Sequence, residues 1–276
     1  MPSCSDYRPT ARQTLKEHND LDVLSTAGLR ERRGDYGVDA PLTGLLPPGA
    51  AGLAFTLLAA FFGRRGQPTA AKLALAASLP ASLTFGIYLH TTRRGKFLVW
   101  AEILERLELR GDEQVLDLGC GRGAVTAMVA KVVPRGKVVG LDLWRTEDQS
   151  GNSPEVTEAN LRAEGVVDRC ELRTGDMLNV PVADGSFDLV VSSLAIHNID
   201  ERDVRHHERR LHAIDEAVRV LKPGGRLVIA DLLWTRRYAH RLRELGMQDV
   251  HQKSLGWRFW YAPGLGAGLV LARKPA

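Results

Sequence analysis

Three glycines in the run VLDLGCGRG have a spacing that suits the binding of a ligand against the backbone. Gly119, Gly121 and Gly123 follow apolar residues typical of a buried strand, and a helical segment begins near Ala124. Glycine allows a tight turn, and a helix N-terminus offers N–H groups with a partial positive charge. The run therefore predicts a site for a carboxylate or a phosphate. A plain tight turn between strand and helix is the alternative.

An acidic residue at the end of the next apolar run adds a second ligand group. The run KVVGLDLW contains Asp142, about 20 residues beyond the glycines, where a carboxylate can accept hydrogen bonds from the ribose of a nucleoside. The glycine spacing lacks the third glycine of the GxGxxG pattern, which closes around a pyrophosphate in dinucleotide-binding folds. A nucleoside-containing cofactor other than NAD is therefore expected.

The elements that must position these residues follow from alternating segments beyond residue 95. Short apolar runs, typical of strands covered on both faces, alternate there with stretches of helical period, the first of them at 95–109. The strand candidates are QVLDL, KVVGLDL, RCELRT, FDLVVSS and RLVIAD, followed by segments at 248–255 and 268–273. This alternation predicts βαβ units and a doubly wound α/β fold.

Taken in order, these motifs resemble the class I S-adenosylmethionine-dependent methyltransferase family, and within it the type 11 and type 25 small-molecule enzymes. The matching blocks are VLDLGCGRG, GLDLW, TGDMLNVPVADGSFDLVVSS and RVLKPGGRLVIAD, which extend over roughly half of the chain. The resemblance implies a Rossmann-like sheet of seven strands, S-adenosylmethionine as cofactor, S-adenosylhomocysteine as product and no metal ion.

The resemblance also implies roles for residues at the expected strand ends. The glycines would pass beneath the methionine part of the cofactor, Asp117 would orient its amino group, and Asp142 would hold the ribose. Asp176 would reach the adenine amino group and Met177 the ring face, with a turn aspartate and a core methionine as alternatives. The expected cofactor-binding residues are Asp117, Gly119, Gly121, Gly123, Asp142, Leu143, Asp176, Met177 and Ser193.

A histidine follows the expected fourth strand, in the run LAIHNID. Ligands of open α/β sheets bind beyond the carboxyl ends of the strands, so this run should border the reacting methyl group. Histidine side chains ordinarily exchange protons near neutral pH, so His197 is a candidate general base or substrate contact during methylation. A histidine that caps a helix or packs in a lid is an equal alternative.

Other residues near the glycines receive mainly structural interpretations. Methyl transfer from a sulfonium needs no enzyme nucleophile, so Cys120 within the glycine run is expected to fill space. In the polar loop after Asp142, Ser153 is a candidate N-cap with Pro154 at the first helical position. Gln149 or Asn152 in the same loop could face a substrate, and a solvated loop is the alternative.

Two apolar stretches precede the expected catalytic domain. No charged residue occurs from Ala40 to Gly63 or from Leu73 to Thr92, and each stretch is long enough to cross a bilayer core of about 30 Å. Basic residues bracket both stretches, as at membrane interfaces. We expect two transmembrane helices in a hairpin at 40–92, with the catalytic domain facing the cytosol. Two buried helices of a soluble lid, interrupted by prolines, are the alternative.

Composition limits the remaining classes of partner. The formal charge of +4 falls short of a dense basic stripe, so nucleic acid is not an expected partner. Three widely spaced cysteines suggest neither a disulfide framework nor a zinc site. Residues 1–39 lack a sustained apolar period and are expected to be a polar arm without a role in the chemistry, ahead of the hairpin at 40–92 and the methyltransferase domain at 95–276.

The chain is accordingly predicted to be an S-adenosylmethionine-dependent methyltransferase that acts on a small-molecule or lipid nucleophile, with membrane association through 40–92. Two other classes of function stay open. One is an NAD-dependent oxidoreductase, which the acidic residue after the second strand would suit. The other is a non-catalytic, membrane-anchored module that binds the cofactor.

Overall fold

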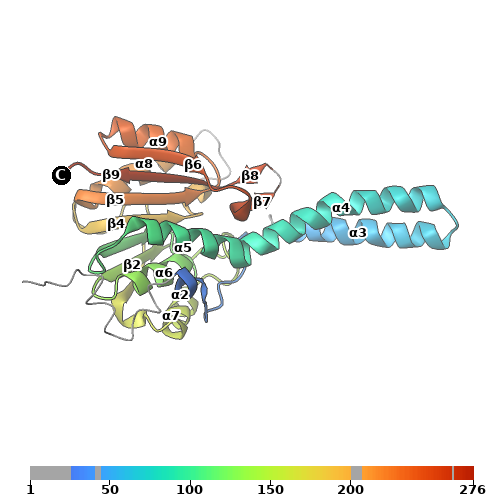
Figure 1. Ribbon diagram of the computed structural model, residues 1–276, viewed down its shortest axis with the longest axis horizontal. Helices are drawn as coiled ribbons and strands as arrows, with labels where there is room; N and C mark the ends of the chain where they lie inside the picture. Colours follow the sequence, from blue (N-terminus) through green and yellow to red (C-terminus); the bar gives the residue numbers. More distant parts are fainter. Residues whose placement is uncertain (1–25, 41–44, 200–206, 263) are drawn as a thin grey trace, which may run out of the picture.

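A mixed sheet of seven strands forms the centre of the computed structural model, which describes residues 26–40, 45–199, 207–262 and 264–276 (Figure 1). The strands are β1 (Gln114–Leu118), β2 (Lys137–Asp142), β3 (Cys170–Thr174), β4 (Phe187–Ser193), β5 (Leu221–Asp231), β6 (Gln248–Ser254) and β9 (Gly268–Arg273). Their order is β3-β2-β1-β4-β5-β9-β6. The first five are parallel, and β9 runs antiparallel to both neighbours. The predicted doubly wound α/β fold is confirmed.

Helices cover both faces of this sheet because its strands are apolar on both sides. Their bounds are α5 (Lys96–Leu107), α6 (Ala124–Val132), α7 (Pro154–Ala163), α8 (His207–Arg219) and α9 (Thr235–Glu244). On β1, Val115 packs in the core shared with α5 and α6, whereas Leu116 and Leu118 pack in the core shared with α8 and α9. Alternating side chains of one strand thus serve two cores.

The helices that begin near the cavity start where the sequence predicts. α6 follows Gly123, whose φ is 80°. Before α7, the Ser153 hydroxyl accepts a hydrogen bond from the Val156 amide at 3.3 Å, and Pro154 occupies the first helical turn. This N-cap satisfies one of the amide groups that a helix start leaves without a partner. The predicted cap is confirmed.

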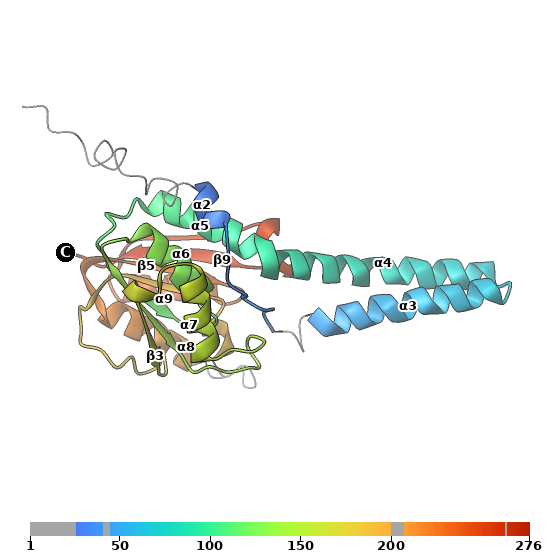
Figure 2. The same cartoon turned by 90° about the horizontal axis from the view of Figure 1, so that it is seen from below.

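Two long antiparallel helices, α3 (Leu46–Arg64) and α4 (Pro68–His90), project from the domain as a rod (Figures 1 and 2). At 1.5 Å per residue they are about 29 and 35 Å long. Only 6% of the most apolar window of each helix is buried. The helices therefore pack on each other and present apolar side chains outward, which is unlike the buried helices of a soluble lid.

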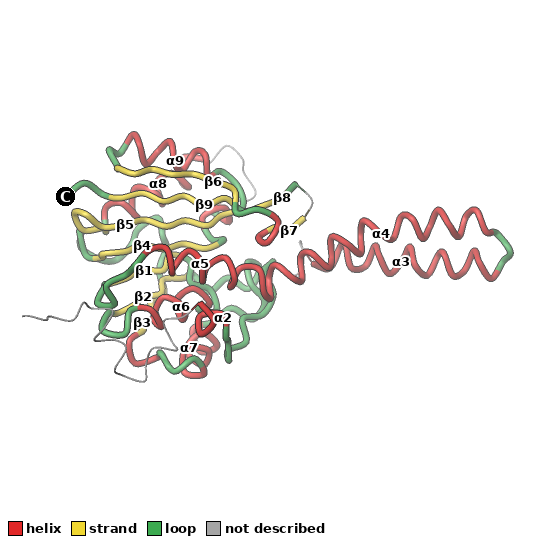
Figure 3. Tube along the Cα trace, in the orientation of Figure 1, coloured by secondary structure: helices red, strands yellow, loops and turns green. Residues whose placement is uncertain are grey.

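The rod is continuous with the domain. α4 passes through a short π-helical segment, η4 (Thr91–Gly95), directly into α5, so that one helical path leads from the tip of the rod to the sheet (Figure 3). Between β6 and β9, a 3-10 turn, η7 (Trp257–Phe259), leads to the short strands β7 (Trp260–Ala262) and β8 (Leu265–Gly266). β7 packs against the base of α4. The sequence does not predict this small hairpin.

Part of the N-terminal segment packs on the domain. The short helix α2 (Thr26–Arg30) lies beside α5, and Leu29 and Tyr36 are 2% and 5% exposed. The Tyr36 hydroxyl donates to Glu164 at 2.9 Å. This differs from the expectation of a polar arm without a role. Residues 1–25 of that arm and 41–44 of the expected hairpin lie outside the described residues.

Candidate cofactor site

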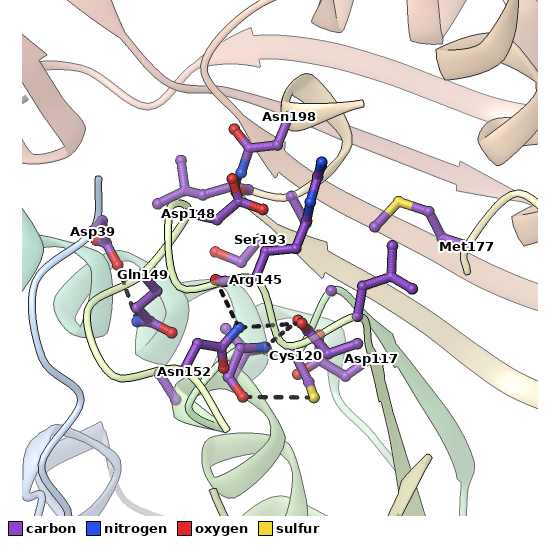
Figure 4. A pocket seen from close by; sticks show the side chains of 18 of the residues that line it. Asp39, Asp117, Cys120, Arg145, Asp148, Gln149, Asn152, Met177, Ser193 and Asn198 are labelled. Atoms are coloured by element: carbon purple, nitrogen blue, oxygen red, sulfur yellow. Dashed lines mark hydrogen bonds between the residues drawn. The ribbon is translucent and has the colours of Figure 1, made fainter. Parts of the chain in front are cut away.

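A cavity lies beyond the carboxyl ends of the parallel strands, where α/β sheets bind their ligands (Figure 4). Its lining comes from the glycine loop, from the polar loop after β2, from the ends of β3 and β4, and from α5. The predicted residues in the lining are Asp117, Gly119, Gly121, Asp142, Leu143, Asp176, Met177 and Ser193. The topology therefore brings together residues that are up to several strands apart in the sequence.

The glycine loop is held close to its neighbours. Gly119 and Gly121 have φ values of 73° and 51°, which are unfavourable for other residues. A Cβ atom on Gly119 would lie 2.2 Å from the Ala195 Cβ, and one on Gly121 would lie 2.5 Å from the Gln149 side chain. Gly123 does not line the cavity, and a Cβ there would lie 2.9 Å from the Thr157 methyl group. Its small size thus serves the packing of α7.

Asp117 is a buried carboxylate with an incomplete set of partners. Its side chain is 1% exposed, and Oδ2 accepts a hydrogen bond from the Thr126 hydroxyl at 2.6 Å. Among the described residues no donor reaches Oδ1. Burial, with a smaller contribution from Asp142, raises the pKa of Asp117 to about 7. A cationic donor in the cavity would satisfy this oxygen and favour the ionised form.

Asp142, at the end of β2, holds the loops around it. Its carboxylate accepts hydrogen bonds from the Gly121 amide at 2.7 Å, the Trp144 amide at 2.6 Å and the Asn152 side chain at 3.2 Å. One carboxylate therefore fixes both the glycine loop and the polar loop after β2. It lines the cavity at the place where the sequence predicts a contact to ribose hydroxyls.

The ends of β3 and β4 supply the opposite wall. Asp176 lines the cavity, and its Oδ1 accepts a hydrogen bond from the Leu178 amide at 2.9 Å, as an aspartate in a turn does. Met177 lines the cavity and also packs against the core shared with α8 and α9. An aspartate in a turn at position 176 and a core methionine at position 177, the alternatives from the sequence, are thus both compatible with a position beside a ligand. Ser193 accepts a hydrogen bond from the Trp100 indole at 2.9 Å, which ties β4 to α5.

His197 lies near the cavity but not in its lining. It belongs to a 3-10 turn, η6 (Ile196–Asn198), and its Nδ1 lies 2.5 Å from the carboxylate of Asp231, which is fully buried at the end of β5. The adjoining Asn198 does line the cavity. The structure therefore orients the His197 ring through Asp231, a partner that the sequence did not reveal.

Residues 31–40 form a strap over the polar loop, and this contribution was missed from the sequence. Asp39 and Gln149 make an isolated antiparallel bridge, the Ala40 amide donates to the Asp148 carbonyl at 2.9 Å, and both Asp39 and Gln149 line the cavity. The Asp39 carboxylate also accepts hydrogen bonds from Thr92, Lys96, Gln149 and Tyr261. The apolar residues of this segment are isolated and show neither a helix period nor a strand period. Nothing in the sequence therefore indicated the strap.

Cys120 fills space, as expected. Its side chain is 7% exposed, and its sulfur lies where a Cβ atom on Gly140 of β2 would come within 2.9 Å. Burial raises the pKa of the thiol well above its ordinary value, because the charged thiolate is penalised away from water. A protonated, enclosed thiol is a poor nucleophile.

The sequence comparison agrees with the strand order and with the cavity. Residues 116–229 match the family described as "Methyltransferase domain". Residues 116–229 of this chain therefore form a methyltransferase domain. The match extends from β1 to β5, and the methyltransferase domain therefore includes the glycine loop, the polar loop after β2 and the strand ends that line the cavity.

Curated relatives of this methyltransferase domain differ in their named activities. Methyltransferase GfsG of Streptomyces halstedii is 33% identical over 132 residues, which are 48% of this chain and 42% of the relative. The sterol 4-C-methyltransferase of Caenorhabditis elegans is 32% identical over 163 residues, 55% of this chain and 44% of the relative. A demethylmenaquinone methyltransferase of Lactobacillus johnsonii is 28% identical over 131 residues, 47% and 48%. The chain spans about half or less of each relative.

Among solved structures, the cyclase SpnF aligns with a TM-score of 0.53 and 19% identity, over 66% of this chain and 83% of that chain. At this identity the likeness shows the fold alone. The name of that protein also illustrates that one fold can support different reactions, so the argument for a reaction must come from the residues of the site.

Proposed function

We propose that this protein is an S-adenosylmethionine-dependent methyltransferase that acts on a small-molecule or lipid nucleophile and is held in a membrane by residues 40–92. The unpartnered Oδ1 of Asp117 is the observation that carries the proposal, because a buried carboxylate at a cavity wall favours a cationic ligand group. The ammonium group of the cofactor's methionine moiety is such a group. The family of the domain supports the same cofactor.

The remaining lining residues fit the other parts of this cofactor. In the proposed arrangement, Asp142 accepts hydrogen bonds from the ribose, Leu143 and Met177 contact the adenine, and Asp176 accepts from its amino group. The glycine loop and Ser193 lie along the methionine moiety. Gly123 supports this loop by close packing.

When bound, the cofactor supplies a methyl group already activated by a positive sulfonium. The protein's task is then to align the acceptor with that methyl group and to exclude water. Orientation of two reactants can contribute about 7 to 11 kcal/mol to lowering a barrier. Trp100 and Phe97 of α5 make one wall of the cavity apolar, which favours exclusion of water.

His197 is the proposed general base for the acceptor's proton. Its pairing with Asp231 supports the assignment, because a buried carboxylate orients an imidazole and stabilises its protonated form. The ring does not line the cavity, so in this role it would take the acceptor's proton through a bridging water beside Asn198, which does line the cavity. A His197→Ala variant with unchanged turnover between pH 6 and pH 9 would remove this part of the proposal.

Membrane anchoring is proposed from the rod. α3 and α4 are long enough to span a hydrocarbon core of about 30 Å, and only 6% of the most apolar window of each is buried. Arg93 and Arg94 lie at the base and Arg64 and Arg65 at the tip, so basic residues stand at both ends. The basic residues of the N-terminal segment lie on the domain side of the rod as well. The larger number of basic residues on that side favours a domain in the cytosol. Relatives named for sterol and demethylmenaquinone methylation are compatible with a lipid acceptor.

The alternatives receive less support. An NAD-dependent oxidoreductase would need a pyrophosphate site, but the glycine loop has no third glycine in the GxGxxG place. The relatives named above are methyltransferases. A non-catalytic module that binds the cofactor would have the same cavity as an enzyme. Only a measurement of turnover distinguishes the two.

Calorimetric titration of the full-length protein in detergent tests the proposal. S-adenosylmethionine and S-adenosylhomocysteine should bind and NADH should not, and Asp142→Ala should weaken binding at least tenfold. Asp184→Asn is a matched control, because Asp184 is an exposed aspartate that pairs with Arg219 away from the cavity. Binding of NADH alone would support the oxidoreductase, and the absence of any binding would contradict the cofactor assignment.

A further inference from the structure

The cavity edge of the sheet faces the rod. β8 leads into β9 at the base of α4, and β9 runs from there toward the C-terminus (Figures 1 and 3). Because β9 is antiparallel to β5 and β6, these two strands end at the base of the rod, and β1, β2 and β4 end at the same edge. A rod embedded in a bilayer would therefore turn this edge toward the lipid surface.

The exposed large apolar side chains of the described residues gather in two places. Most lie on the rod: Leu46, Leu53, Phe55, Leu57, Leu58, Phe61, Leu73, Leu75, Leu79 and Leu83. The others are Leu143, Leu233 and Trp257, with exposed fractions of 49%, 45% and 67%. They follow the ends of β2, β5 and β6, all at the edge that faces the rod. Leu143 borders the cavity, and its proposed role is contact with the cofactor. The proposed function gives no role to the exposed side chains of Leu233 and Trp257.

Basic and aromatic side chains accompany these two residues. Arg236 and Arg237 are exposed just after Leu233, and the Arg237 guanidinium lies 4.9 Å from the centre of the Trp234 ring. Trp257 stacks on His90, the last residue of α4, with ring centres 6.5 Å apart. Tryptophan favours the membrane interface, and arginine is attracted to anionic headgroups.

We propose that this strand-end face, defined by Leu233, Trp257, Arg236 and Arg237, rests on the surface of the bilayer that holds the rod. The inference depends on the membrane rod of the proposed function and goes beyond it, because a rod alone would leave the domain free to stand away from the lipid. The stacking of Trp257 on His90, the last residue of α4, places this exposed tryptophan directly beside the rod, which favours lipid over a protein partner or a second copy.

Contact between this face and the lipid would limit the class of methyl acceptor. Lys96 and Phe97 line the cavity and belong to the helix that continues from α4, and Asp39 lines it just before the rod begins. A face seated on lipid would place this side of the cavity at the headgroup level. The acceptor is then a membrane-resident molecule whose reactive group lies near the headgroups, reached without passage through bulk water.

Quenching of tryptophan fluorescence by brominated lipid tests the contact in the full-length protein. The protein is reconstituted in vesicles of phosphatidylcholine and phosphatidylglycerol whose acyl chains carry bromine near the headgroup, to reach Trp257, or near the chain end, to reach Leu79→Trp. The emission of Trp257 is obtained as the difference between the native protein and Trp257→Phe. Two variants in the Trp257→Phe background serve as references: Leu79→Trp within the rod, and Lys137→Trp at the start of β2, on the opposite edge of the sheet.

We expect brominated lipid to remove most of the Trp257 and Leu79→Trp emission and to leave Lys137→Trp unchanged. Arg236→Gln combined with Arg237→Gln should reduce the quenching of Trp257 without changing that of Leu79→Trp. If Leu79→Trp is quenched and Trp257 is not, the face does not touch lipid, and the inference fails while the membrane rod stands. Protection of Trp257 from iodide without quenching by bromine would indicate a protein contact and would also overturn it.

A failure of the proposed function gives a different pattern. If neither Trp257 nor Leu79→Trp is quenched, the membrane rod itself is wrong and the inference fails with it. Titration of the same vesicles with S-adenosylmethionine reports the cofactor site separately, because none of the substituted residues lines the cavity.

Discussion

The methyltransferase domain and the rod place the same kinds of side chain in opposite environments. Leu116 and Leu189 in the sheet are fully buried, whereas Leu57 and Leu79 at the middle of the two rod helices are 61% and 64% exposed. Apolar surface leaves water wherever a less polar environment is available. In the domain this environment is the protein itself, and in the rod the proposed bilayer would supply it. The rod would then gain its stability from its surroundings, whereas the domain gains it from its own core.

Matched leucine truncations should separate the two regions most strongly. Leu116→Ala removes buried contacts and leaves a cavity, so the free energy of unfolding of the domain should fall by about 2 to 5 kcal/mol. Leu79→Ala should change it by less than about 0.5 kcal/mol, because this side chain touches little protein. Denaturant unfolding in a mild detergent, followed by tryptophan fluorescence, measures both. Equal effects would show that the rod is part of the domain's folding unit.

A charge in the rod should act on membrane retention instead of domain stability. Arginine at the centre of a transmembrane helix costs about 2.5 to 3.5 kcal/mol on insertion scales, so Leu79→Arg should shift protein from the membrane fraction to the supernatant. Leu79→Phe is the control and should stay in the membrane. Flotation of vesicles followed by quantification of both fractions gives the result. Complete retention of Leu79→Arg would contradict a rod that spans the bilayer.

The strands were predictable because each strand of a buried parallel sheet is a short apolar run that can be recognised from neighbouring residues alone. Runs such as QVLDL and FDLVVSS are apolar on both faces, and the structure places strands there. The two apolar stretches of the rod also carry a local signal. The strap at 31–40 could not be predicted, because its stability comes from scattered contacts such as Tyr36 to Glu164, between residues distant in sequence. The β7–β8 hairpin is too short to give a pattern.

The strap meets both regions at Asp39, so this residue tests how they are joined. Lys96 is only 6% exposed beside the Asp39 carboxylate, and Asp39→Asn would leave this cation without its partner. Hydrogen bonds to charged groups are worth about 1.5 to 3 kcal/mol, and we expect a loss of that size in the free energy of unfolding. Asp35→Asn, whose side chain is 85% exposed in the same strap, should have little effect. Equal stability of both variants would contradict a structural junction at Asp39.

The site shows the same division between local and distant signals. The motif predicted Asp117, Asp142 and the glycines because they lie at the ends of strands or directly after them. It could not predict Asp231 as the partner of His197, since the two meet only when β4 and β5 pair. Gly123 shows the limit of a motif from the other side. It belongs to the run but packs against α7 instead of lining the cavity.

Asp117 provides the test with the smallest expected effect. It is a polar group that the domain buries, whereas only 6% of the most apolar window of each rod helix is buried. Burial raises the pKa of Asp117 from an ordinary 3.8 to about 7, so the folded, cofactor-free protein retains a proton that the unfolded chain has already released. This contribution to stability is complete below the unfolded value and is lost as the pH rises through about 7. Binding of an ammonium group requires the ionised carboxylate and should reverse that trend.

The affinity for S-adenosylmethionine should accordingly fall by up to tenfold for each pH unit below about 7, and level off above it. Thermal stabilisation by the cofactor should be larger at pH 8 than at pH 6. Asp117→Asn cannot ionise, so its affinity should be low and nearly independent of pH, whereas Asp184→Asn should keep the native profile. Calorimetry at a series of pH values makes the comparison. A native profile that stays flat from pH 5.5 to pH 8 would show that Asp117 does not face the cofactor's ammonium group.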